Sequence, residues 1–99
     1  MAQDGVTVMA MSLFPLGRTV ATPGALEALS AMGRQPEELF ARHACGDDGD
    51  LGEEDRDANR QALARGGRIF SCYVFDEARL YLVTEHDRSA TTLCLAEEY

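Results

Sequence analysis

The chain has no tryptophan and no lysine among its 99 residues, and it has only three cysteines and three prolines. With no tryptophan, four phenylalanines and three tyrosines, the core is expected to be mainly aliphatic. All nine basic residues are arginines, including those at ordinary surface positions where lysine would serve equally well. We attach no functional meaning to that choice.

Long apolar runs are also missing from the sequence. None is long enough for a signal peptide or a membrane span. The cysteines, Cys45, Cys72 and Cys94, are an odd number without the short spacing of a disulfide or metal motif. We therefore expect a cytoplasmic protein whose thiols are reduced.

Positive charge is scarce relative to negative charge, and the formal net charge is −8 at pH 7. Nucleic acids and membrane surfaces are polyanions, so direct binding to either is disfavoured. The charge instead favours a partner protein with a basic surface. A chain of 99 residues is expected to form a single domain, with little room for a deep substrate cleft.

The N-terminal residues show no clear hydrophobic period. We expect residues 1–12 to be a loosely ordered extension and residues 13–99 to form the domain. Residues 16–21 predict a short strand at a sheet edge, because Pro15 cannot donate to a central ladder.

Capping residues predict three short helices. The first begins after Thr22, which can cap free amides, has Pro23 at its first position and ends at Gly33. Its apolar residues at helical spacing are Leu26, Leu29 and Met32. The second runs from Pro36 to about Ala44, and its buried side is expected to carry Leu39, Phe40 and His43.

The third helix is expected to begin near Glu54 or Asp55 and to end at Gly66. Beyond Arg68 the pattern becomes typical of strands, which predicts a hairpin over residues 68–86 and a further strand over 90–95. The predicted fold class is α+β, with three short helices packed on a mainly antiparallel sheet of three to four strands.

The segment "CGDDGDLGEEDRDAN" at residues 45–59 is the most acidic part of the chain. It fails as an EF-hand calcium loop, because with Asp48 at position 1 the glycine required at position 6 is replaced by Glu53. A weak divalent-ion site formed by Asp47, Asp48 and Asp50 stays open. The acids from Glu53 to Asp57 suit the start of a helix, so the loop "GDDGDL" is the part that still needs an explanation.

One hypothesis is that these carboxylates imitate the phosphates of DNA and occupy the basic surface of another protein. The candidate partner-binding residues are Asp47, Asp48, Asp50, Glu53, Glu54, Asp55 and Asp57.

The alternative hypothesis is a small metal- or thiol-dependent enzyme. Its candidate cluster is His43, Glu85, Asp87 and Arg88, with Asp47 and Asp50 as further acids. Zinc bound by His43 and Cys45 would need further ligands from Cys72, Cys94 or His86, and the spacing matches no zinc motif. We therefore expect no catalytic residues, no metal and no cofactor. The two hypotheses differ in geometry, because the enzyme requires His43 and an acid of the 85–88 turn to meet in one pocket.

Three blocks of the sequence resemble a family of small bacterial proteins carried on plasmids and integrative conjugative elements. The blocks are "VATPGALEAL", "RH" followed by "GDDGDL", and "VTEHDRSATT" ending in "EEY". Some members are labelled type I restriction enzyme subunits, and the family has no established activity. The chain departs from the family pattern at Asp48, where a tryptophan is usual.

The resemblance implies an accessory protein of a mobile genetic element that binds another protein and is not an enzyme. The narrower expectation is an inhibitor of a host nuclease complex, of a restriction or CRISPR system, that acts through the acidic surface.

Overall fold

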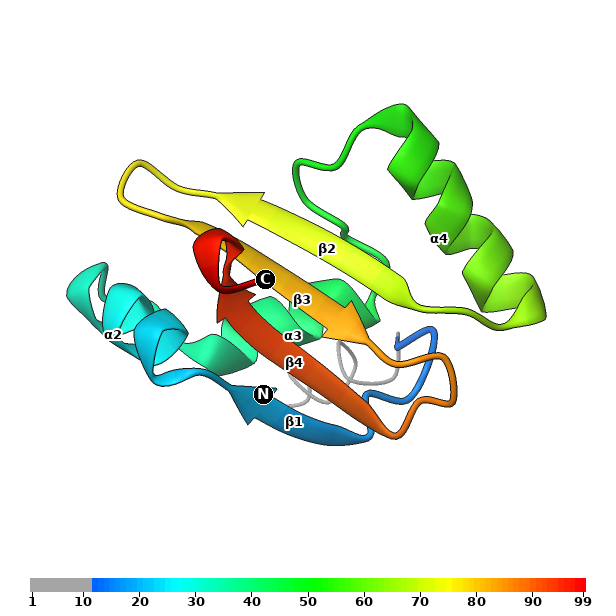
Figure 1. The fold of residues 1–99 in the computed structure, drawn as a ribbon, viewed down its shortest axis with the longest axis horizontal. Coiled ribbons are helices and arrows are strands. Elements are labelled where there is room, and N and C mark those ends of the chain that lie inside the picture. Colours follow the sequence, from blue (N-terminus) through cyan, green and yellow to red (C-terminus); the bar gives the residue numbers. More distant parts are fainter. Residues whose placement is uncertain (1–11) are drawn as a thin grey trace, which may run out of the picture.

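The computed structural model describes residues 12–99 and has the predicted α+β class (Figure 1). The elements in chain order are β1 (Arg18–Ala21), α2 (Pro23–Ala31), α3 (Pro36–Ala44), α4 (Glu53–Arg65), β2 (Ile69–Val74), β3 (Arg79–Thr84), β4 (Ala90–Leu95) and the 3-10 helix η1 (Ala96–Glu98). The predicted N-terminal extension lies outside the described residues, apart from Ser12.

The strands form one sheet in the order β1-β4-β3-β2. β2 pairs antiparallel with β3, and β3 pairs antiparallel with β4, as the hairpin pattern predicted. β1 pairs parallel with β4, so the sheet is mixed. β1 and β2 are therefore the two edge strands, and the predicted edge position of the first strand is confirmed.

Both α2 and α3 pack on the same side of the sheet, which we call the back face (Figure 1). Thr22 caps α2, because its side-chain oxygen accepts from the backbone N–H of Ala25 at 3.1 Å. The core consists of Ala25, Leu29, Leu39, Tyr73, Leu80, Leu82 and Leu93. Leu29 is buried as predicted, but Leu26 is 44% exposed. At that turn of the helix the small Ala25 faces the sheet in its place.

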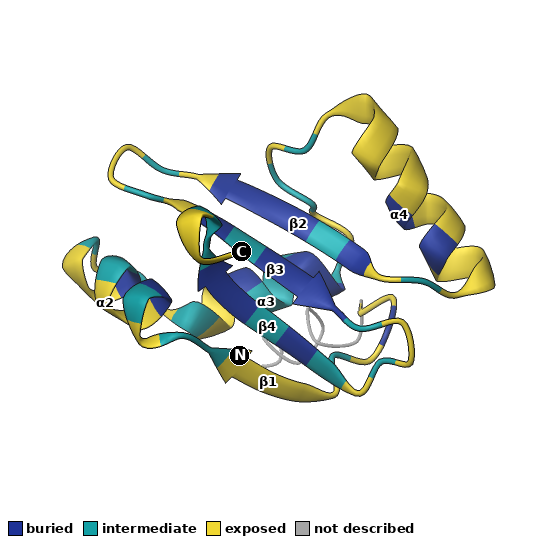
Figure 2. Ribbon diagram, viewed as in Figure 1, coloured by how far each residue is buried: buried dark blue, intermediate teal, exposed yellow. Residues whose placement is uncertain are grey.

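The opposite side of the sheet, the front face, carries no helix of the described chain except η1 at one end (Figure 1). Cross-strand partners share a face, so the register defines two rows there. One row is Val20, Thr92, Val83 and Phe70, and the next is Cys94, Tyr81 and Cys72. Exposure is highest along the edge strand β1 and in α4 (Figure 2). Within residues 12–99, no helix has the length and apolar character needed to cross a membrane.

Candidate functional site

The loop "GDDGDL" lies along the outer edge of β2. Gly49 makes a parallel bridge with Cys72. The N–H of Asp50 donates to the carbonyl of Cys72 at 2.7 Å, and the N–H of Cys72 donates to the carbonyl of Asp48 at 3.2 Å. Part of the acidic segment thus acts as a short extra strand.

Two side chains complete the coverage of this edge. Asn59 of α4 donates to the carbonyl of Phe70 at 2.7 Å and accepts from its N–H at 3.0 Å. The carboxylate of Asp50 accepts from the N–H of Val74 at 2.9 Å. The outward N–H groups of Phe70, Cys72 and Val74 are therefore all bonded, which protects the edge from pairing with another chain.

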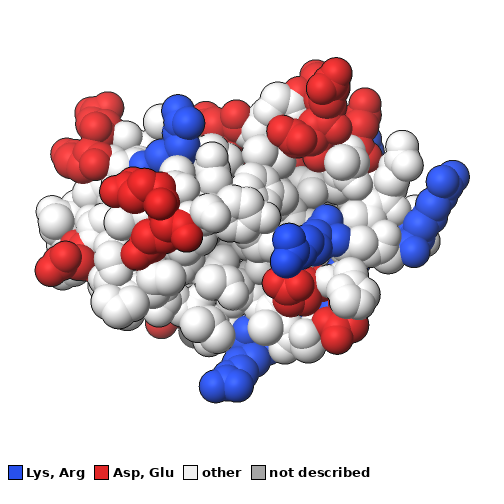
Figure 3. All heavy atoms as spheres, viewed as in Figure 1, with Lys and Arg blue, Asp and Glu red and all other residues white. Residues whose placement is uncertain are grey.

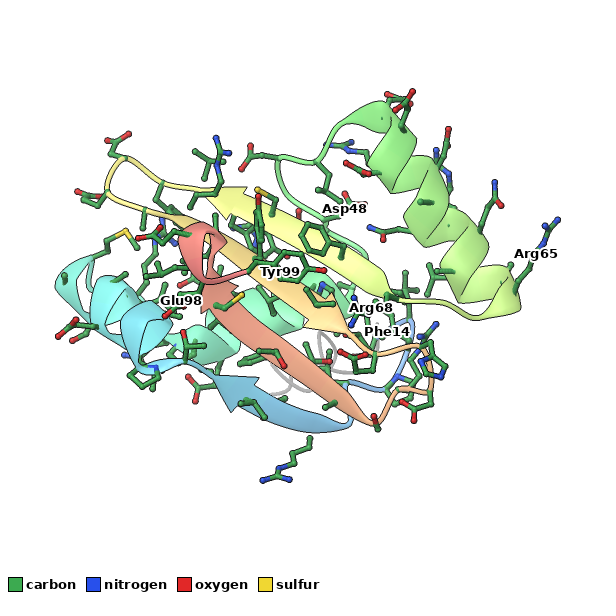
Figure 4. The ribbon with its side chains drawn as sticks, viewed as in Figure 1. Phe14, Asp48, Arg65, Arg68, Glu98 and Tyr99 are labelled. Atoms are coloured by element: carbon green, nitrogen blue, oxygen red, sulfur yellow. The ribbon has the colours of Figure 1, made fainter. Side chains whose placement is uncertain are left out.

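The other loop acids are also engaged within the molecule. Asp47 accepts from Nε of Arg42 at 2.8 Å and from the N–H of Gly49 at 3.1 Å. The side-chain hydrogen bond with Arg42 is the main cause that lowers the pKa of Asp47. Asp48 lies 3.3 Å from the amide of Asn59 and 3.6 Å from Arg56 (Figure 4).

In the first two turns of α4, Asp57 pairs with Arg60. Glu53, Glu54 and Asp55 are exposed, and within the described chain they have no ion pair or hydrogen bond through their side chains. Of the seven candidate partner-binding acids, these three are the most available to another molecule. Figure 3 shows acidic side chains gathered over this end of α4.

His43, from the alternative cluster, is 1% exposed and lies inside a hydrogen-bond chain. The hydroxyl of Thr91 donates to the carbonyl of Leu16, so the hydroxyl of Thr84 must donate to Thr91. Thr84 therefore accepts from Nε2–H of His43 at 2.8 Å, and Nδ1 of His43 accepts from the hydroxyl of Ser71 at 2.6 Å. Because each hydroxyl has only one hydrogen to donate, the imidazole carries its hydrogen on Nε2 and is in one neutral tautomer.

Burial lowers the pKa of His43 to about 4, so the ring is neutral near pH 7. His43 and Ser71 line a cavity of about 240 Å³, together with Asp48 and Asn59. A hydroxyl that donates to an imidazole resembles a nucleophile with its base, but a base with this pKa accepts protons weakly at neutral pH. Ser71 is itself 1% exposed, so the arrangement is better suited to holding α3 on the sheet.

The 85–88 turn does not join this cavity. Glu85 lies on the other face of the sheet from Thr84 and His43, with its carboxylate 3.4 Å from Arg68. Asp87 accepts from the N–H of Ser89 and closes the turn. His43, Glu85 and Asp87 are therefore not brought together in one pocket.

Arg88, in the same turn, makes structural hydrogen bonds to backbone carbonyls. Its backbone is left-handed, with φ of 61°. Its guanidinium donates to the carbonyls of Ala62 at 3.1 Å and of Gly67 at 2.7 Å, as well as to two carbonyls of its own turn. Arg88 thus ties the C-terminal end of α4 to the β3–β4 connection.

The three cysteines are separate free thiols. Cys72 and Cys94 flank Tyr81 in the register, and burial is the main cause that raises the pKa of each thiol. Among residues 12–99, no group of three or more His, Cys, Asp and Glu side chains is placed to hold a metal ion.

An aromatic cluster on the front face was not predicted from the sequence. The rings of Phe70 and Tyr81 lie 4.8 Å apart, and Tyr99 packs against both at 5.5 and 5.7 Å. Tyr99 is nevertheless 65% exposed, and Arg68 lies beside it (Figure 4). The cluster joins β2, β3 and the C-terminal residue. Its only signal in the sequence was the presence of apolar residues on both faces of the strand over residues 69–75.

Comparison of the chain with protein-family models, with curated proteins and with solved structures finds no match.

Proposed function

We propose that this protein is a non-enzymatic binding protein that docks its front face on a basic, partly apolar surface of another protein. The observation that carries the proposal is the aromatic cluster of Phe70, Tyr81 and Tyr99 on a sheet face that no long helix of the described chain covers. Aromatic side chains are enriched among the residues that contribute most to protein interfaces.

Charge supports the choice of a basic partner. Acidic side chains gather over the first turn of α4, the β2–β3 turn and η1, whereas the middle of the front face is largely neutral and several arginines interrupt its rim (Figure 3). An apolar centre with a polar rim is the usual anatomy of a protein interface, and the rim here is acidic over the first turn of α4, the β2–β3 turn and η1. The complementary surface would carry arginine or lysine around an apolar depression.

The resemblance supports a narrower form of the proposal. Accessory proteins of mobile elements commonly protect the element from host defence, so we propose a host nuclease complex of a restriction or CRISPR system as the partner. In this form Glu53, Glu54 and Asp55 would occupy the arginines and lysines that otherwise bind DNA phosphates. The loop acids Asp47, Asp48 and Asp50 would act mainly by holding the edge of β2.

The test is capture of partners from host lysate by the immobilised protein, with the bound protein identified and the capture repeated over a salt series. We expect Tyr99→Ala and Glu54→Arg each to weaken capture at least tenfold, because hot-spot aromatic residues and rim charges both contribute. Both side chains are exposed, so folding should be preserved.

The matched control is Glu27→Arg, which makes the same change of charge on α2, over the back face. It should leave capture unchanged. The proposal fails if Glu27→Arg weakens capture as much as Glu54→Arg, or if capture does not change between about 50 and 500 mM salt.

A further inference from the structure

Within residues 12–99, some backbone groups at the outer edge of β1 have no hydrogen-bond partner. Arg18 donates its N–H to the carbonyl of Ser89, and Thr22 donates its N–H to the carbonyl of Leu93. A parallel ladder repeats every two residues, so the backbone groups of Thr19 and Ala21 point away from β4. Within the described chain, those groups have no hydrogen-bond partner.

The contrast with the other edge of the sheet is clear. At β2, one loop and the side chains of Asn59 and Asp50 bond every outward N–H of the strand. At β1, no such device is present in residues 12–99, although Val20 is 41% exposed. Covering one edge and leaving the other open is what a strand-accepting sheet requires.

An apolar hollow of about 370 Å³ lies under the β1 edge, on the back face. Its lining comes from the β1 segment and from α3, and includes Leu16, Thr19, Phe40, Ala41, Ala44 and Cys45. Glu37 is also part of the lining and is the acidic residue there. The hollow therefore lies behind β1, between this strand and α3, next to the edge at which a fifth strand would pair.

We propose that β1 accepts an extended segment of a partner protein as a fifth strand of the sheet. The backbone of the segment pairs with Thr19 and Ala21. An apolar side chain of the segment enters the hollow, and a neighbouring arginine or lysine pairs with Glu37. Alternating apolar and basic residues are therefore the chemistry of this segment.

A second copy of this chain fits the edge less well. If two β1 strands paired, the back-facing residues of the second copy would be Thr19 and Ala21, whose side chains are too small to fill about 370 Å³. Two chains of net charge −8 would also repel each other. The unpaired backbone, the apolar hollow and the charge all favour a basic, extended segment from another protein.

This inference goes beyond the front-face proposal and rests on a different edge and hollow, so either can fail alone. The probe is a synthetic peptide of seven residues with alternating leucine and arginine, titrated into the full chain and followed by amide NMR and fluorescence anisotropy. We expect the amides of Thr19 and Ala21 to exchange quickly in the free protein and at least tenfold more slowly with the peptide bound.

Thr19→Pro removes the outward N–H without touching the ladder with β4, and it should weaken peptide binding at least tenfold. Thr19→Val keeps that N–H and should bind as the unmodified chain does. The same peptide with every amide N-methylated has the same charge but has no N–H to donate to the carbonyls of β1, and its methyl groups block close approach of the two backbones, so it should not bind.

The peptide experiment distinguishes strand pairing from charge attraction and from an edge that is already covered. Equal binding of the N-methylated peptide, or of Thr19→Pro, would mean charge attraction alone and would overturn the inference. Slow exchange at Thr19 and Ala21 in the free protein would mean that the chain itself or a second copy already covers the edge, which also overturns it. A failed peptide test, together with weakened capture by Tyr99→Ala and Glu54→Arg, would leave the proposed function standing.

Discussion

At the scale of single residues, His43 shows how one buried polar group is accommodated. The ring is 1% exposed, with both nitrogens bonded to hydroxyls of β2 and β3. A buried imidazole is tolerated when both nitrogens have partners and the ring stays neutral. The row of hydrogen bonds that runs from Ser71 through His43 and Thr84 to Thr91 meets both conditions.

The first prediction concerns pH. The ordinary pKa of histidine is 6.5, and that of folded His43 is about 4, so between these values the unfolded chain binds a proton that the folded protein does not. This contribution to stability is complete above pH 6.5 and is lost as the pH falls through 4. The difference between the two pKa values corresponds to about 3 kcal/mol. Urea unfolding at several pH values between 7.5 and 4 measures it.

His43→Leu should remove this pH dependence between pH 6.5 and 5 and should cost about 2–4 kcal/mol at pH 7, since Ser71 and Thr84 lose their partner. His86→Gln is the control, because His86 is an exposed histidine in the 85–88 turn. An unchanged slope in His43→Leu would show that other groups cause the loss.

At the scale of elements, the acidic segment divides into two structures with different roles. The loop from Asp48 to Asp50 pairs with β2, and the residues from Glu53 begin α4. The acids in the first turn of α4 complement its dipole. The loop explains why glycine is needed at residue 49, where φ is +72° and a Cβ would lie 2.2 Å from the carbonyl oxygen of Cys72.

The second prediction compares two glycines of this segment. Gly49→Ala should destabilise the fold by about 2 kcal/mol or more, because both the backbone conformation and the contact with Cys72 exclude a side chain. Gly52→Ala is the matched control, since its φ is −75° and nothing lies within 4 Å of an added Cβ. The measurement is the urea midpoint of each variant. Similar small effects at both positions would contradict the pairing of the loop with β2.

At the scale of the whole molecule, the net charge of −8 acts on a chain whose radius of gyration is 13.3 Å. The ion pairs between described residues lie mostly at the surface, as with Arg34–Glu38, and such pairs contribute little. Repulsion among the carboxylates therefore outweighs them.

The third prediction is that added salt stabilises this protein. Raising sodium chloride from about 20 to 300 mM should raise the melting temperature and add about 1 kcal/mol of stability, because salt screens the repulsion. The double variant Asp76→Asn, Glu77→Gln removes two exposed charges of the β2–β3 turn and should show a smaller salt effect. Thermal unfolding measures both. A melting temperature that falls with salt would show that the ion pairs dominate.

The elements and the fold class follow from the sequence alone, because their signals are local. Thr22 and Pro23 mark the start of a helix wherever they occur, and the β-rich pattern after Arg68 specifies a hairpin without reference to the rest of the chain. The N-terminal start of α4 differed from the prediction by one or two residues, with Glu53 in place of Glu54 or Asp55. The role of the acids as a helix start was also local, through the dipole.

The roles of the polar residues, in contrast, depend on contacts between segments that are distant in the sequence. Asn59, Asp50 and the 48–50 loop meet β2 across 11 to 24 residues of sequence, and no local pattern encodes that edge. The aromatic cluster and the open edge of β1 likewise depend on the strand order β1-β4-β3-β2, which brings the two ends of the described chain together in one sheet. Hydrogen-bond partners and faces are fixed by packing, so they appear only when the chain is folded.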